Sequence, residues 1–184
     1  RLSTAHGSKG ALGDVGIHIV DFATFAAGSA PHSVSCRTAV FHKAPDDKIG
    51  DYTLDANDSF VMHMDLANGA IGTITASRFA SGHHNDLRLR IYGDKGGLQV
   101  LFERNESRLR AAIGPDALAK EEWTDIDCPP VATIYQRFIA AIRGEAPAEP
   151  TFLRGAELQQ VLDLAGRSQE MGSRSLTLEA VAEA

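Results

Sequence analysis

The sequence has little cysteine, and its cysteines form no recognisable metal-binding pattern. Only two occur among 184 residues, Cys36 and Cys128, and neither belongs to a C-x-x-C motif or to a Cys/His cluster. A structural zinc site is therefore not expected. We interpret both as small buried hydrophobic side chains, in the reduced state that is typical of a cytoplasmic protein.

Long apolar runs and an excess of positive charge are also missing. No stretch reaches the roughly 18 apolar residues that a membrane span requires, because His18 and Asp21 interrupt the most apolar segment, residues 15–27. The formal net charge is −6 and the basic residues are scattered, so the chain is not expected to bind nucleic acid. An apolar fraction of 43% is typical of a soluble globular domain.

The hydrophobic periodicity predicts helices at both ends of a sheet-forming region. Residues 12–27 fit a helix that ends at Gly28, and residues 32–42 alternate as a strand before a polar loop over 43–51. After Pro130 the period becomes helical again. The predicted later elements are a helix that ends near Gly144, a helix over 155–171 and a last strand over 175–178.

The middle of the chain consists of short alternating strands joined by tight turns. Residues 52–104 contain Asn68-Gly69 and a glycine-rich turn over 93–97, and residues 107–128 add one or two further strands. This pattern predicts an α+β fold: an open, mostly antiparallel β-sheet with helices packed on one face. The other sheet face would then be uncovered, which favours a homo-oligomer.

Three ionisable residues share one face of the first predicted helix. At about 100° per residue, the i, i+4, i+7 spacing places Asp14, His18 and Asp21 in one narrow stripe on an otherwise apolar helix. Ionisable groups on a buried helix are costly unless they are paired or used, so the stripe is expected to face a cleft. Histidine can exchange a proton near neutral pH, and a carboxylate one turn away can orient it.

Spacing alone leaves other interpretations of this stripe open. It could be a solvent-facing polar face, with Asp14 favoured near the helix N-terminus by the dipole. The three side chains could also be ligands of zinc or manganese, as in a metal hydrolase. Arg78, which follows a predicted strand, could point toward a substrate or could be an ordinary sheet-surface arginine.

The stripe lies within a longer motif. Residues 10–21, GALGDVGIHIVD, closely resemble the G-x-L-x-D-x-G-x-H-x-x-D signature of the glucose–fructose oxidoreductase / inositol dehydrogenase / rhizopine-catabolism family (Gfo/Idh/MocA). Further segments resemble the family in the expected order: 58–60, 66–72, 76–78, 85–98, 135–144 and 150–168. The resemblance therefore covers nearly the whole chain.

The resemblance implies a sugar or polyol dehydrogenase that uses NAD or NADP. His18 would be the acid/base, Asp14 would orient the substrate and the catalytic groups, and Asp21 would contact a substrate hydroxyl. Family members dimerise or tetramerise through the sheet, which implies a homodimer or homotetramer. The family pairs an N-terminal Rossmann domain with a C-terminal α+β domain, and residues 1–184 correspond to the second as a single substrate-binding and oligomerisation domain. Cofactor-binding residues within this chain are not identified, and no metal site is expected.

The chain departs from the family in what it lacks. It contains no G-x-G-x-x-G fingerprint after a first strand, and the spacing of Gly7, Gly10 and Gly13 is different. The family's catalytic lysine, in a Glu-Lys-Pro motif, is also absent. We therefore expect the cofactor to bind mainly to an N-terminal domain outside this chain. Residues 1–184 alone would then be inactive. The alternative is a non-catalytic ligand-sensing or assembly module of the same fold.

Overall fold

The computed structural model describes residues 2–178, which divide into two compact units. The first unit contains the residues up to Phe79 and those from Pro150 onward, and the second contains residues 80–149. The expectation of one substrate-binding and oligomerisation domain over 1–184 stays a prediction. Among the residues described, no helix is both long and apolar enough to cross a membrane.

The first unit is built on a four-stranded sheet in which every neighbouring pair is antiparallel. Its order is β10-β1-β4-β5, with β10 Leu176–Thr177, β1 Pro31–Ala39, β4 Ser59–Leu66 and β5 Ile71–Ser77. Met62 on the central strand β4 lies opposite Cys36 on one side and Ile74 on the other. All three side chains are buried, so this register places a continuous apolar stripe across the sheet.

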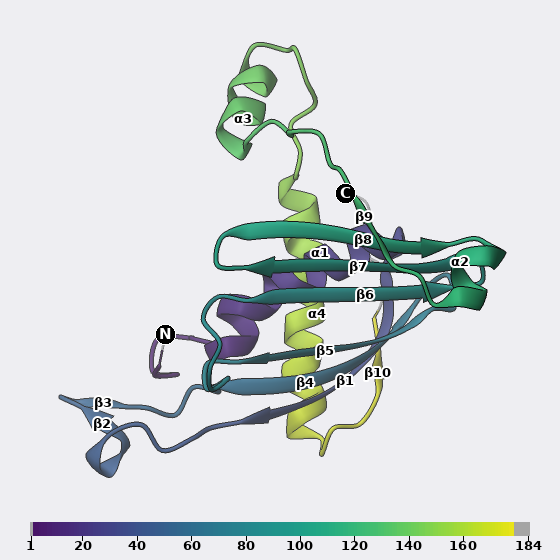
Figure 1. The fold of residues 1–184 in the computed structure, drawn as a ribbon. Coiled ribbons are helices and arrows are strands. Elements are labelled where there is room, and N and C mark those ends of the chain that lie inside the picture. The colour runs from purple at the N-terminus through teal and green to yellow at the C-terminus, as the bar shows by residue number, and fades with distance from the viewer. Residues whose placement is uncertain (1, 179–184) are drawn as a thin grey trace. The chain divides into compact units, whose positions relative to one another are not determined.

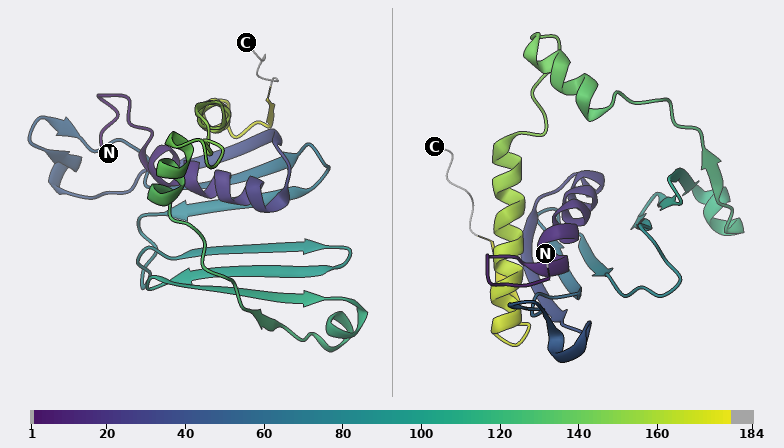
Figure 2. Two further views of the ribbon diagram at one scale, coloured as in Figure 1. Left: turned by 90° about the horizontal axis from the view of Figure 1, so that it is seen from above. Right: turned by 90° about the vertical axis from the view of Figure 1, so that its left-hand side faces the viewer.

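Two helical elements cover one face of this sheet, as Figures 1 and 2 show. The first is a π-helical turn, Leu12–Gly16, that continues directly into α1, Ile17–Ala27. The second is the long helix α4, Phe152–Glu170, which packs mainly on β1 and also touches α1. The core between the helices and the sheet includes Val20, Val34, Phe60, Met62, Val161, Leu162 and Ala165.

The connection from β1 to β4 is more structured than the expected polar loop. It contains a short 3-10 turn, Pro45–Asp47, and a two-stranded ribbon of β2 Lys48–Ile49 and β3 Tyr52–Thr53. The predicted strand 32–42 is wrong at its end, because β1 stops at Ala39. The main chain then leaves the ladder, and the N–H of Phe41 donates to the carboxylate of Asp58.

The second unit contains a separate four-stranded antiparallel sheet of order β6-β7-β8-β9. Its strands are β6 Leu87–Gly93, β7 Gly96–Glu103, β8 Glu106–Ile113 and β9 Thr124–Ile126, with the short helix α2, Pro115–Lys120, before β9. Register pairs Leu89 with Val100 and Val100 with Leu109, so one face of the sheet is apolar. These three side chains are only half-buried.

Helix α3, Ile134–Ile142, completes the second unit and confirms the helix predicted to end near Gly144. Thr133 forms a capping box with Gln136, which satisfies helix N–H groups that would otherwise lack partners. The apolar side chains of this helix are largely exposed, with Ile142 at 67%.

The predicted fold class is confirmed, with one correction. All strand pairs within residues 2–178 are antiparallel and helices are few, but the hydrogen bonds divide the strands into two four-stranded sheets and one ribbon.

Both cysteines are free and Cys36 is buried as expected. The prediction that Cys128 is buried is wrong, because it lies exposed in the irregular segment after β9.

Candidate functional site

The helix that carries the predicted site begins at Gly10, a position where any side chain would collide with neighbouring backbone. Gly10 has φ +60°, and a Cβ there would come within 2.2 Å of the backbone oxygen of Asn57. L-residues with side chains pay a steric penalty in this left-handed region. The segment before β4 can therefore approach the helix main chain directly.

Asn57 contacts the head of this helix with three hydrogen bonds. Its main-chain oxygen accepts from the N–H of Ala11 at 2.8 Å, and its Oδ1 accepts from the N–H of Leu12 at 2.9 Å. Its Nδ2 donates to the carbonyl of Lys9 at 2.6 Å. The N–H of Gly10 donates to the hydroxyl of Ser8 at 3.2 Å, so the first three amides of the helix have partners.

The first turn of the helix is π-helical, which the sequence pattern did not predict. Residues Leu12–Gly16 form this turn, and Asp14 lies in its middle. The predicted helix over 12–27, ending at Gly28, is confirmed, but the 100° wheel does not apply to Asp14, because the first turn is π-helical. Gly16 ends the turn against the ring of Phe60, where a Cβ would lie 3.2 Å from the ring. Turns of this kind occur frequently at functional sites.

Asp14 and Arg78, two of the four predicted site residues, form an ion pair. The Nη2 of Arg78 donates to Oδ2 of Asp14 at 2.8 Å, and the two side chains are 21% and 30% exposed. Arg78 comes directly after β5, so the sheet supplies the cation and the π turn supplies the carboxylate. Charge-assisted hydrogen bonds of this kind fix the orientation of a carboxylate.

Asp21 is paired with an arginine that was not among the predicted site residues. The Nε of Arg154, in the first turn of α4, donates to Oδ1 of Asp21 at 2.9 Å. Its Nη2 donates to the hydroxyl of Thr24 at 2.6 Å, and its Nη1 to Glu157 at 3.3 Å. Asp21 therefore joins α1 to α4.

His18 lies in the first turn of α1, and its side chain is exposed. Within residues 2–178, its imidazole forms no hydrogen bond or ion pair, so no other described side chain fixes either ring nitrogen. A hollow of about 350 Å³ lies beside the head of the same helix, with Asp14 and Gln159 on its wall. The predicted stripe thus comprises an exposed imidazole and two carboxylates that pair with arginines on other elements.

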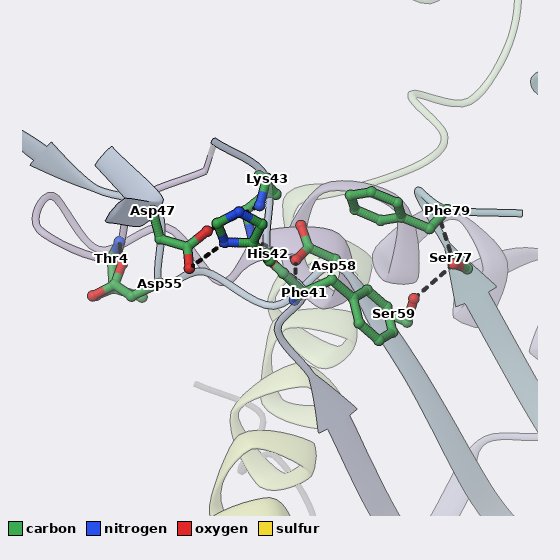
Figure 3. Close-up of polar contacts among 10 residues, drawn as sticks. All are labelled: Thr4, Phe41, His42, Lys43, Asp47, Asp55, Asp58, Ser59, Ser77 and Phe79. Atoms are coloured by element: carbon green, nitrogen blue, oxygen red, sulfur yellow. Dashed lines mark hydrogen bonds and ion pairs between the residues drawn. The ribbon is translucent and has the colours of Figure 1, made fainter. Parts of the chain in front are cut away.

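The structure adds a buried ion pair next to Asn57. Asp58 is fully buried, and its Oδ2 accepts hydrogen bonds from the N–H of Phe41 and from Nζ of Lys43 (Figure 3). Its main-chain oxygen accepts from the N–H of Arg78 at 2.9 Å. The sequence feature that could have indicated this buried ion pair is the position of Asp58 directly before the regular apolar strand β4. Its partners could not be identified without the loop geometry.

The residues present offer little support for a metal or a dinucleotide bound at the helix head. Across the described part of the chain, no group of three or more His, Cys, Asp or Glu residues is arranged to hold a metal ion. The glycine-rich segment could bind a phosphate only through unpartnered helix N–H groups. The N–H groups of Gly10, Ala11 and Leu12 are instead bonded to Ser8 and Asn57.

The chain is similar to one known protein family and to curated proteins with dehydrogenase names. A family model described as the GFO/IDH/MocA C-terminal domain matches residues 1–99. A levoglucosan dehydrogenase from Pseudarthrobacter phenanthrenivorans is 26% identical over 63% of this chain and 33% of its own length. An inositol 2-dehydrogenase from Rhizobium meliloti is 30% identical over 88% of this chain and 48% of its own length. The chain thus spans half or less of each relative.

Solved structures share the fold across nearly the whole chain. A levoglucosan dehydrogenase in complex with NADH and levoglucosan superimposes with a TM-score of 0.82 at 20% identity, covering 98% of this chain and 53% of that one. An oxidoreductase domain protein from Kribbella flavida gives 0.78 at 24% identity, covering 97% and 54%. At these identities the likeness supports the fold.

Proposed function

Because the chain belongs to the Gfo/Idh/MocA family, we propose that it supplies the substrate-binding and proton-transferring part of an NAD(P)-dependent sugar or polyol dehydrogenase. The observation that carries the proposal is that Asp14, one helical turn before the exposed His18, is held by an ion pair with Arg78, which follows β5. Two relatives with dehydrogenase names, for levoglucosan and for inositol, support a polyhydroxylated substrate.

In the proposed mechanism His18 exchanges the proton of the substrate hydroxyl. An exposed imidazole can reach a substrate, and a positioned acid/base of this type typically contributes a factor of about 10²–10⁴ in rate. Asp14, held by Arg78, orients the hydroxyl or the imidazole. Asp21, held by Arg154, would accept a hydrogen bond from a second hydroxyl of the sugar.

The nicotinamide would carry the hydride, and its binding site would lie mainly in a second, Rossmann-type domain. Two observations support this division. The curated relatives are two to three times as long as the matched region, and the glycine-rich helix head of this chain is saturated by its own hydrogen bonds. The choice between NAD and NADP would then depend on that other domain.

We also propose a homo-oligomer that associates through exposed sheet surface. In the second unit, the apolar face around Leu89, Val100 and Leu109 is only half-buried, and in the first unit Ile71 of β5 is 84% exposed. Contiguous exposed apolar surface is typical of an association site. Light scattering of the purified protein at micromolar concentration tests this, and a monomer would contradict it.

The test of the catalytic proposal is a substrate screen with the natural protein that contains this chain, at its full length. Sugars and polyols are offered with NAD or NADP, and reduced nicotinamide is followed by absorbance. His18→Ala should lower kcat at least about 100-fold. His42→Ala, which removes another exposed histidine of the first unit, should stay within about twofold. Sugar binding without turnover in the natural protein would contradict the proposal and favour a sensing or assembly module.

A further inference from the structure

Asn57 bonds to the helix head from 45 residues away in the sequence. Capping side chains usually come from the residue just before a helix. Here the acceptor for Leu12 and the donor to Lys9 belong to one amide group, so a single planar side chain fixes the main chain on both sides of Gly10. Residues within the helix alone would not impose this constraint.

The position that Asn57 fixes is the one at which the π turn begins. Its Oδ1 bonds to the N–H of Leu12, the first residue of the turn, and Asp14 follows two residues later. A π turn changes the rotation between successive side chains, so the direction of Asp14 depends on where that turn begins. A shift of the helix head by one residue would change which side chain faces Arg78.

The residue after Asn57 holds the other partner of the ion pair. The main-chain oxygen of Asp58 accepts from the N–H of Arg78 at 2.9 Å, and Arg78 in turn donates to Asp14 at 2.8 Å. Asn57 is thus bonded to the helix two residues before Asp14, and the adjacent Asp58 is bonded to Arg78 itself. Asp58 is itself fixed by its buried carboxylate, which Phe41 and Lys43 contact (Figure 3).

We propose that Asn57 is a positioning residue for the proton-transfer site, acting through the helix head on Asp14 and His18. This inference rests on the proposed dehydrogenase function. Asn57 acts on geometry, and its loss should therefore affect turnover far more than substrate affinity. Misplacement of catalytic groups by about 1 Å can cost about 100-fold in rate.

The test uses Asn57→Ala, Asn57→Asp and the control Asn68→Ala in the full-length natural protein. Asn68 lies beyond the opposite end of β4, and its Oδ1 also accepts one main-chain hydrogen bond, from Ala70. Asn57→Ala should lower kcat about 10- to 100-fold with KM within about twofold, and it should speed amide exchange over residues 9–16 at least about tenfold. Asn68→Ala should change neither.

Asn57→Asp keeps the acceptor for Leu12 and loses the donor to Lys9, so its kcat should lie between those of the wild type and Asn57→Ala. The proposal is overturned if Asn57→Ala loses no more turnover than Asn68→Ala, or if turnover falls while residues 9–16 stay protected. If Asn57→Ala does not fold, wild-type kcat in Asn57→Asp overturns it. An inactive wild-type protein would instead refute the proposed function, and the exchange rates would still decide whether Asn57 holds the helix head.

Discussion

Replacement of Gly10 by alanine tests the contact between the helix head and the segment before β4. Alanine at φ +60° costs about 1–2 kcal/mol from the left-handed backbone alone. The added Cβ would also lie 2.2 Å from the carbonyl oxygen and 2.6 Å from the nitrogen of Asn57, both of which are backbone atoms that cannot rotate away. The helix head must therefore move, which breaks the hydrogen bonds from Ala11 and Leu12 to Asn57.

The expected loss of stability follows from these terms. Two hydrogen bonds at about 1 kcal/mol each add to the backbone cost, so Gly10→Ala should lower the free energy of unfolding by about 3–4 kcal/mol. Gly7→Ala is the matched control, since Gly7 has φ +79° but no atom within 4 Å of an added Cβ. It should lose only the backbone cost, about 1–2 kcal/mol.

Urea unfolding followed by far-ultraviolet circular dichroism measures both variants, because the signal reports the helices of the first unit. The difference between Gly10→Ala and Gly7→Ala should be about 2 kcal/mol at an unchanged denaturant slope. Equal losses in the two variants would contradict this expectation, because the close approach of Asn57 to Gly10 would then contribute nothing to stability.

Two further predictions concern other parts of the first unit and the exposed cysteine. Arg154→Ala removes the donors to Asp21 and Thr24 and should lower the free energy of unfolding by about 1–2 kcal/mol in the same urea assay. The control Arg167→Ala, which replaces an exposed arginine of the same helix, should change it by no more than about 0.5 kcal/mol. Burial raises the pKa of the Cys36 thiol to about 11, so near pH 8 only about one thiol in a thousand is ionised and an aromatic disulfide reagent should modify one cysteine per folded chain. Rapid modification of two cysteines without urea would contradict this.

Much of the fold could be predicted because its signals are local. Strand alternation and the Asn68-Gly69 turn identified β4 and β5, and the helical period after Pro130 identified α3. The π turn could not be predicted in the same way, because its residues carry the same apolar spacing as an ordinary helix. The division of the strands into two sheets depends on which edges pair, and alternation within a strand does not specify that.

The sequence named candidate site residues, whose roles stay predictions, but it did not name the residues that contact them. The motif identified Asp14 and His18, and Arg78 was named without a contact. The pairing of Asp14 with Arg78 spans 64 residues, and that of Asp21 with Arg154 spans 133. Such contacts depend on how the sheet and the helices pack, so composition and spacing gave no indication of them.

The exchange of the substrate proton by His18 is tested by the pH dependence of kcat/KM. The measurement compares the full-length natural protein with its His18→Ala variant, with and without added imidazole. If His18 is the acid/base, an ionisation present in the wild-type profile should disappear in the variant. Free imidazole should also restore part of the lost rate, because it can occupy the space of the missing ring. A variant that keeps the wild-type profile and rate would contradict this role of His18.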